Sequence, residues 1–331
     1  MESLCACEAA TPNALATTAS KPPPPRRNWL RLSLGLAVGG LVAAAACVFT
    51  GAHVHDVVRY ATGVSPWLIA GCMASSFVDA ALQSLRWHAV MQPVVGLRYR
   101  EAYCARMLAF MFNAFLPGRG GDLLRVRWLA RRTGVSRTLL LATEVIDRWI
   151  DCGGWVPVLL AVCVVGHPPS WLFRALGTFG SALLVSGALM LMLGRRAPAV
   201  GRHSRFARLC SAFQVGIGAF RAPRTWRIAL FLAPLPWLWE SLTIYWATRA
   251  FGIDIPWLAA FSVLVGLNLG TLVPSPGAIG AIEAGGTAAL VFCGVDQSQA
   301  LAFMCVYHFT QLVPGVLGGA LCALVQRGKL L

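Results

Sequence analysis

Long apolar runs recur along this chain, and they constrain its fold more than any other feature. The first, from Leu32 to Thr50, spans about 19 residues without a charge, enough for a helix to cross a hydrocarbon core of about 30 Å. With 57% hydrophobic and 12% charged residues, the composition lies outside the range of soluble domains. The sequence therefore predicts an all-α polytopic membrane protein with about six full crossings, at residues 32–50, 66–90, 138–165, 171–193, 228–250 and 298–325.

Positive charge is concentrated between these apolar runs. The formal net charge is +15, and eight arginines fall in a linker at about residues 195–227. Such charge is typical of cytoplasmic loops that face an anionic leaflet, whereas nucleic-acid binding would fit only a soluble chain. We therefore expect the linker and both termini to be cytoplasmic, with residues 1–28 as a disordered tail and residues 29–331 as one transmembrane domain.

Motifs for catalysis or metal binding are not found. The sequence has no H-E-x-x-H pair, no G-x-S-x-G stretch and no C-x-x-C pair. Most of the eleven cysteines stand singly in apolar segments, where cysteine behaves as a small hydrophobe. We predict no metal, no cofactor and no enzymatic activity.

A helix-breaking stretch interrupts the apolar run that begins at Tyr103. This run has only about 14 residues, too few for a crossing, before Asn113, Pro117, Gly120 and Gly121. Basic residues then return at helical spacing, so both ends of the segment are expected on the cytoplasmic side. The segment is predicted to enter the membrane, break at residues 117–121 and return.

A second stretch of the same kind follows the apolar run from Trp257. Its helix-breaking and polar residues are Asn268, Pro274, Pro276, Gly277 and Gly280. Neither lysine nor arginine occurs between residues 249 and 327, so this hairpin is expected to enter from outside. Two opposed re-entrant hairpins would form an inverted repeat whose broken helices meet near the midplane. The alternative is a pair of proline kinks in ordinary spanning helices.

The candidate substrate-binding residues are charged residues beside the breaks and in the first turns of the predicted helix at residues 138–165. A charge at the bilayer centre costs from about 2.5 to more than 10 kcal/mol, so these groups should be paired or hydrated. Arginine can bind an anionic group through two parallel hydrogen bonds, and the acids would pair the arginines while no ligand is bound. For Arg125, Arg127, Arg131 and Arg132, a stripe facing solvent or head groups is the simpler interpretation. The candidates are Arg119, Asp122, Arg125, Asp147, Arg148, Asp151 and Glu283.

Four stretches resemble the lysylphosphatidylglycerol synthase transmembrane (flippase-like) family. They are Leu85-Arg-Trp87, Asn113 to Arg125, Val145 to Asp151, and Pro274 to Glu283. The family's acid before Arg148 is glutamate, whereas this chain has Asp147. The resemblance implies a bacterial plasma-membrane protein with a lipid-handling core, without the soluble domain that performs aminoacyl transfer in the full-length synthases.

The predicted function is translocation of a phospholipid or other anionic lipid between leaflets, with a partner enzyme supplying the lipid. Two alternatives stay open at this point. One is an intramembrane lipid- or glycan-modifying transferase, with its active site in an acidic loop. The other is an accessory subunit of a membrane complex whose partner performs the chemistry.

Overall fold

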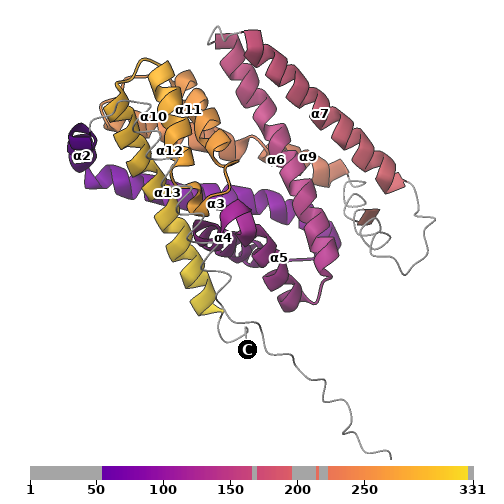
Figure 1. Ribbon diagram of the computed structural model, residues 1–331. Helices are drawn as coiled ribbons and strands as arrows, with labels where there is room; N and C mark the ends of the chain where they lie inside the picture. Colours follow the sequence, from indigo (N-terminus) through magenta and orange to yellow (C-terminus); the bar gives the residue numbers. More distant parts are fainter. Residues whose placement is uncertain (1–53, 166–169, 196–213, 216–222, 327–331) are drawn as a thin grey trace, which may run out of the picture.

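The computed structural model describes residues 54–165, 170–195, 214–215 and 223–326 (Figure 1). All regular secondary structure within these ranges is helical. The predicted tail at residues 1–28, the predicted crossing at 32–50 and most of the basic linker lie outside the described residues.

Helix α7 (Ser170–Arg195) separates two similar series of helices. The first series consists of α2 (Val54–Thr62), α3 (Pro66–Val95), α4 (Tyr99–Phe115), the short 3₁₀ turn η1 (Pro117–Arg119), α5 (Gly120–Thr133) and α6 (Arg137–Val165). The second consists of α9 (Pro223–Leu232), α10 (Leu235–Ala250), α11 (Trp257–Gly270), the 3₁₀ turn η3 (Pro276–Ala278), α12 (Ala281–Phe292) and α13 (Gln297–Val325). Each series thus has a long helix, a helical hairpin broken at a Pro-Gly turn, and another long helix.

Three stretches of the described chain are long and apolar enough to cross a membrane, and they coincide with three predicted crossings. These are Pro66–Gln92, Arg227–Ala250 and Gln297–Val325. The predicted runs at residues 138–165 and 171–193 are the helices α6 and α7.

The predicted crossing at residues 228–250 is interrupted, a feature that was not predicted from the sequence. Helix α9 ends at Leu232 and α10 begins at Leu235, with Pro234 directly before α10 and Pro236 in its first turn. Proline has no backbone N–H and its ring clashes with the preceding turn, which explains the interruption.

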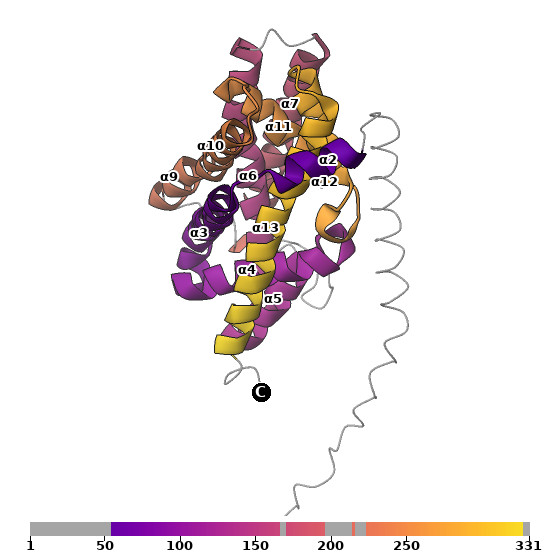
Figure 2. The same cartoon turned by 90° about the vertical axis from the view of Figure 1, so that its left-hand side faces the viewer.

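Several contacts between helices recur in the two series. In each series the two helices of the hairpin contact each other, α4 with α5 and α11 with α12. The last helix of each series also contacts the first hairpin helix of the other series: α13 contacts α4, and α6 contacts α11. Likewise α2 contacts α13 as α9 contacts α6, while α3 and α10 contact each other. Figure 2 shows α13 passing along both α12 and α4. Exchanging the two series leaves these contacts unchanged, which is the pattern that an internal repeat produces.

Each series also has its own apolar core. One core gathers side chains of α3, α4, α5 and α6 around Trp87, Met91 and Leu129. The other lies mainly among α10, α11, α12 and α13, around Phe261, Phe303 and Leu264. The pocket described next is lined by residues of both series.

Candidate functional site

The first break is a tight turn with two consecutive left-handed residues. Gly118 has φ 66° and ψ 31°, and Arg119 has φ 56° and ψ 34°. The N–H of Gly121 donates to the Asn113 side-chain oxygen at 2.8 Å. A Cβ atom on Gly121 would lie 2.3 Å from the carbonyl oxygen of Ala109. Asn113 and Gly121 therefore hold α4 and α5 closely together below the turn, and Arg119 stands at its tip.

The second break repeats this geometry with different side chains. Gly277 has φ 61° and Ala278 has φ 53°, so two consecutive residues are again left-handed. Glu283, in the first turn of α12, accepts a hydrogen bond from the Gly280 N–H at 2.7 Å. Asn268 differs from Asn113, because its amide donates at 2.9 Å to Leu264 within its own helix. The break thus presents an alanine at the position where the first break presents Arg119.

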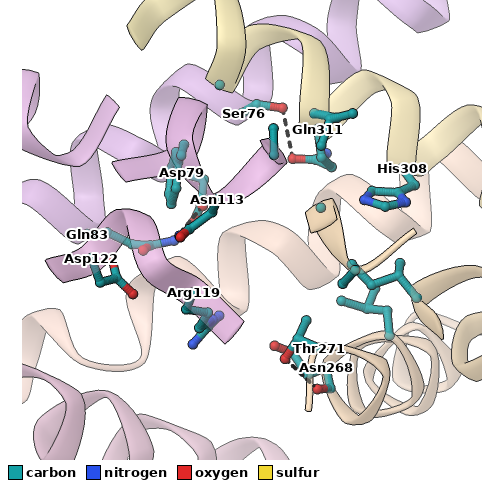
Figure 3. Close-up of a pocket in the computed structure, with 18 of the residues that line it drawn as sticks. Ser76, Asp79, Gln83, Asn113, Arg119, Asp122, Asn268, Thr271, His308 and Gln311 are labelled. Atoms are coloured by element: carbon teal, nitrogen blue, oxygen red, sulfur yellow. Dashed lines mark hydrogen bonds between the residues drawn. The ribbon is translucent and has the colours of Figure 1, made fainter. Parts of the chain in front are cut away.

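The two breaks meet at a pocket with a volume of about 260 Å³. A Cβ atom on Gly277 would lie 3.5 Å from the carbonyl oxygen of Ala114, which places the second turn against the end of α4. Figure 3 shows Arg119 and Asn113 from the first break and Asn268 from the second among the residues around this pocket. The sequence-predicted residues that line it are Asn113, Arg119, Asp122, Arg148, Asp151, Asn268 and Gly277.

Eight charged side chains form one continuous ion-pair cluster beside the first break. Asp147 lies at its centre, accepting from Arg86 Nε at 2.9 Å and from an Arg106 Nη at 3.2 Å. All three of these side chains are completely buried. The cluster consists of Arg86, Arg106, Arg125 and Arg148 with Asp122, Glu144, Asp147 and Asp151, so its formal charges cancel.

Arg148 joins the cluster to the pocket. It contacts Asp122 of α5 at 3.1 Å, and Glu144 and Asp151 of its own helix at 3.1 and 3.6 Å. Asp122 and Asp151 line the pocket with it, whereas Asp147 lies behind the pocket wall. One face of the pocket therefore carries Arg148, an arginine that already forms ion pairs with carboxylates.

Arg125 does not belong to a stripe facing solvent or head groups. Its side chain is 0% exposed, pairs with Glu144 and Asp122, and lies with its guanidinium 4.3 Å from the centre of the Trp87 ring. Arg127 and Arg131 are exposed, and the stripe interpretation stays available for them. Burial of Arg125 follows from its helical position, since it faces α6 rather than the outer side of α5.

Arg119 differs from the four clustered arginines. It is exposed, lines the pocket, and makes no ion pair within 4 Å to any residue that the structure describes. A left-handed backbone costs an L-residue with a Cβ roughly 1–2 kcal/mol. The turn therefore holds the backbone of Arg119 at the pocket against a local preference of the chain, and its guanidinium has no ion pair among the described residues.

Glu283 contacts a histidine instead of an arginine. Its second carboxylate oxygen lies 2.7 Å from His308 Nδ1, and both side chains are largely buried. His308 lines the pocket, and Glu283 lies behind it. Glu283 therefore fixes both the start of α12 and the orientation of His308.

Several residues of the site were not singled out from the sequence. Arg86, Arg106 and His308 are not among the candidate residues predicted from the sequence. The available signal was energetic, because a charge inside an apolar helix requires a partner. That signal does not say which partner, so the pairing of Arg86 with Asp147, 61 positions away, needed the structure.

Helices suited to a membrane, two broken hairpins and a polar pocket between them define an α-helical membrane protein with an internal polar site. The chain belongs to the family described as lysylphosphatidylglycerol synthase TM region, and the match covers residues 32–319. This confirms the resemblance found in the sequence. Comparison with curated proteins finds no match. The chain is thus a multi-pass membrane protein of a lipid-handling family.

Proposed function

We propose that the pocket binds the phosphate of an anionic phospholipid head group and that the protein moves such lipids between leaflets. The observation that carries this proposal is Arg119, the one pocket arginine without an ion pair among the described residues. Arginine that must hold phosphate only transiently should have no permanent carboxylate partner, because the phosphate would otherwise compete with it. Arg119 meets this requirement, and Arg148 does not.

The buried cluster supports the same function by holding the pocket wall in place. Its arginines and acids neutralise one another, so the helices α3, α4, α5 and α6 can carry charges inside an apolar protein. Such pairs favour a fixed arrangement, since separating one partner leaves an unpaired buried charge. A head group could then pass the tips of the hairpins without disturbing the surrounding helices.

We further propose that the two hairpins enter the membrane from opposite sides of a bacterial plasma membrane. The repeated contacts of the two helix series support an inverted repeat, and the distribution of arginines supports cytoplasmic termini. Six crossings would then surround the hairpins, including those at residues 32–50, 138–165 and 171–193.

This topology predicts opposite access routes to the two tips. A single cysteine placed at Gly118 should be labelled by a polar maleimide through a water path from one side, and a cysteine at Ala278 from the other. Each cysteine is introduced into a variant that lacks the native cysteines. A cysteine that replaces Asp254, in an exposed loop, serves as the reference for labelling from the outer side. Labelling of both tips from the same side as ordinary loop residues would contradict the opposed hairpins.

The transport activity is tested with purified protein in liposomes. We expect it to accelerate leaflet exchange of fluorescent phosphatidylglycerol, measured by quenching of the outer-leaflet label. Exchange of a neutral glycolipid in the same vesicles, which lacks phosphate, should be much slower. Mass spectrometry of co-purified lipids identifies the natural head group. Absence of exchange with any anionic lipid would contradict transport and favour the transferase or accessory-subunit alternatives.

A further inference from the structure

Two carboxylic acids line the pocket outside the ion-pair cluster, one from each helix series. Asp79 lies on α3 and Glu240 on α10, and these helices cross where the Ser75 and Thr243 hydroxyl oxygens are 2.5 Å apart. Asp79 accepts one hydrogen bond from Gln83 at 2.7 Å, while its other oxygen is buried without a partner. Glu240 makes no hydrogen bond or ion pair with any described residue. Among the described residues, neither acid therefore forms an ion pair with an arginine, whereas every acid of the cluster does.

The tyrosine at the same place lacks a partner as well. Tyr307 of α13 lines the pocket with a side chain that is only 3% exposed, and its hydroxyl makes no hydrogen bond. Asp79 and Glu240 are the acids whose charges act on it. A buried donor without an acceptor costs about 1–3 kcal/mol. The Tyr307 hydroxyl and the two acids line the same pocket, where a group that enters it could pair with them.

The surrounding charges do not neutralise these two acids. The groups whose charges act on Glu240 are Asp79 and Asp151, both acidic. The charges of Arg86 and Arg106 also act on Asp79, but both arginines already form ion pairs with Asp147. The remaining titratable groups that line the pocket or face the acids are Cys72 of α3, Arg119 of η1, Asp122 of α5, Arg148 of α6, and Tyr307 and His308 of α13. The cluster is neutral, and Arg119 is the one arginine of this pocket without an ion pair among the described residues.

We infer that Asp79 and Glu240 form a proton-binding site, and that a lipid phosphate bound at Arg119 causes one of these carboxylates to take up a proton. This inference rests on the proposed function, because it assumes that the phosphate binds at Arg119. The bound species is a proton from the aqueous phase. A carboxylate oxygen forms an O–H bond with it, and the hydronium ion that supplied it becomes water.

The coupling has a definite sign. Asp79, Glu240 and Arg119 line the same pocket. A phosphate bound at Arg119 brings a further negative charge into the pocket that holds the two carboxylates, and in a poorly hydrated site this favours the entry of a proton. Phosphate binding therefore favours protonation, and by reciprocity protonation favours phosphate binding. Lipid affinity should fall as pH rises, by about tenfold per pH unit where one proton is taken up.

The test measures binding of short-chain phosphatidylglycerol to the full chain in detergent between pH 5 and 9. The phosphodiester stays singly charged throughout this range, so the lipid itself contributes no pH dependence. We expect the affinity of the unmodified protein to fall about tenfold per pH unit over part of the range. In weak buffer with a pH indicator, about one proton should disappear for each lipid bound.

The variants separate the proton site from other causes. Glu240→Gln with Asp79→Asn should bind as tightly as the unmodified protein does at low pH, without pH dependence and without proton uptake. The single variants give the same comparison if the double variant does not fold. Asp254→Asn, which removes an exposed acid in a loop, should keep the full pH dependence.

Four outcomes would overturn the inference. Unchanged pH dependence in the double variant would assign the titration to another group, such as His308. Binding that depends on Arg119 but is accompanied by no proton uptake would leave the proposed function standing and remove the coupling. A requirement for Na⁺ over choline, without proton uptake, would replace the proton by a metal cation. Absence of lipid binding at every pH would overturn the phosphate site together with the coupling.

Discussion

Replacing Arg119 by glycine is expected to abolish leaflet exchange of fluorescent phosphatidylglycerol while leaving the fold at least as stable. Hydrogen bonds to charged groups contribute about 1.5–3 kcal/mol each, so loss of a bidentate phosphate contact should slow exchange by about a hundredfold or more. The backbone at this position is left-handed, with φ 56°. Glycine removes the associated cost of roughly 1–2 kcal/mol, so the unfolding temperature should not fall.

The second break supplies a matched control. Ala278 has the corresponding left-handed backbone, with φ 53°, but its side chain carries no charge. Ala278→Gly should therefore raise the unfolding temperature to a similar extent and keep exchange near the unmodified rate. Arg119→Ala removes the charge while retaining the backbone cost, and it should be as inactive as Arg119→Gly. Unchanged exchange in either Arg119 variant would contradict the phosphate site, and loss of exchange in Ala278→Gly would indicate that turn rigidity is being measured instead.

The helix breaks were predictable from the sequence because their signals are local. Proline and glycine interrupt a helix through the backbone of a few adjacent residues, so Pro117 and residues 274–280 could be recognised without knowledge of the rest of the fold. The two breaks could also be recognised as related from the sequence, because each follows an apolar run too short for an ordinary crossing. The same local signal was present at Pro234 and Pro236, and it was overlooked because the surrounding segment is long and apolar.

The partners of the charged residues could not be predicted, because they come from different helices. Asp147, Arg148 and Asp151 were recognised as a group within one helix. Their partners Arg86 and Arg106 lie on α3 and α4, and each looks like an isolated charge in its own segment. Helical rotation decides which of them point inward, and rotation depends on packing between helices. This is why Arg125 is buried while Arg127, two positions later, is exposed.

Asp147→Asn is expected to destabilise the protein by about 3–5 kcal/mol, the cost typical of removing one partner from a buried ion pair. Asp147, Arg86 and Arg106 are all completely buried. The substitution keeps the shape of the side chain but leaves two guanidinium groups with one fewer negative charge between them. Arg106 suffers most, because Asp147 is its one ion-pair partner among the described residues and its other nitrogen atoms lack hydrogen bonds. The measurement is the unfolding temperature and the folded yield in detergent.

Asp254→Asn makes the same chemical change in a different environment. Asp254 contacts Arg249 at 2.8 Å, but its side chain is 82% exposed, so the loss should be about 1 kcal/mol or less. Asp147→Glu keeps the charge, matches the glutamate of the family motif, and should lose far less stability than Asp147→Asn. Equal destabilisation by the two Asn variants would contradict a structural role for burial in the cluster. If Asp147→Glu is as damaging as Asp147→Asn, the geometry of the short carboxylate, and not its charge alone, holds α3 and α4 against α6.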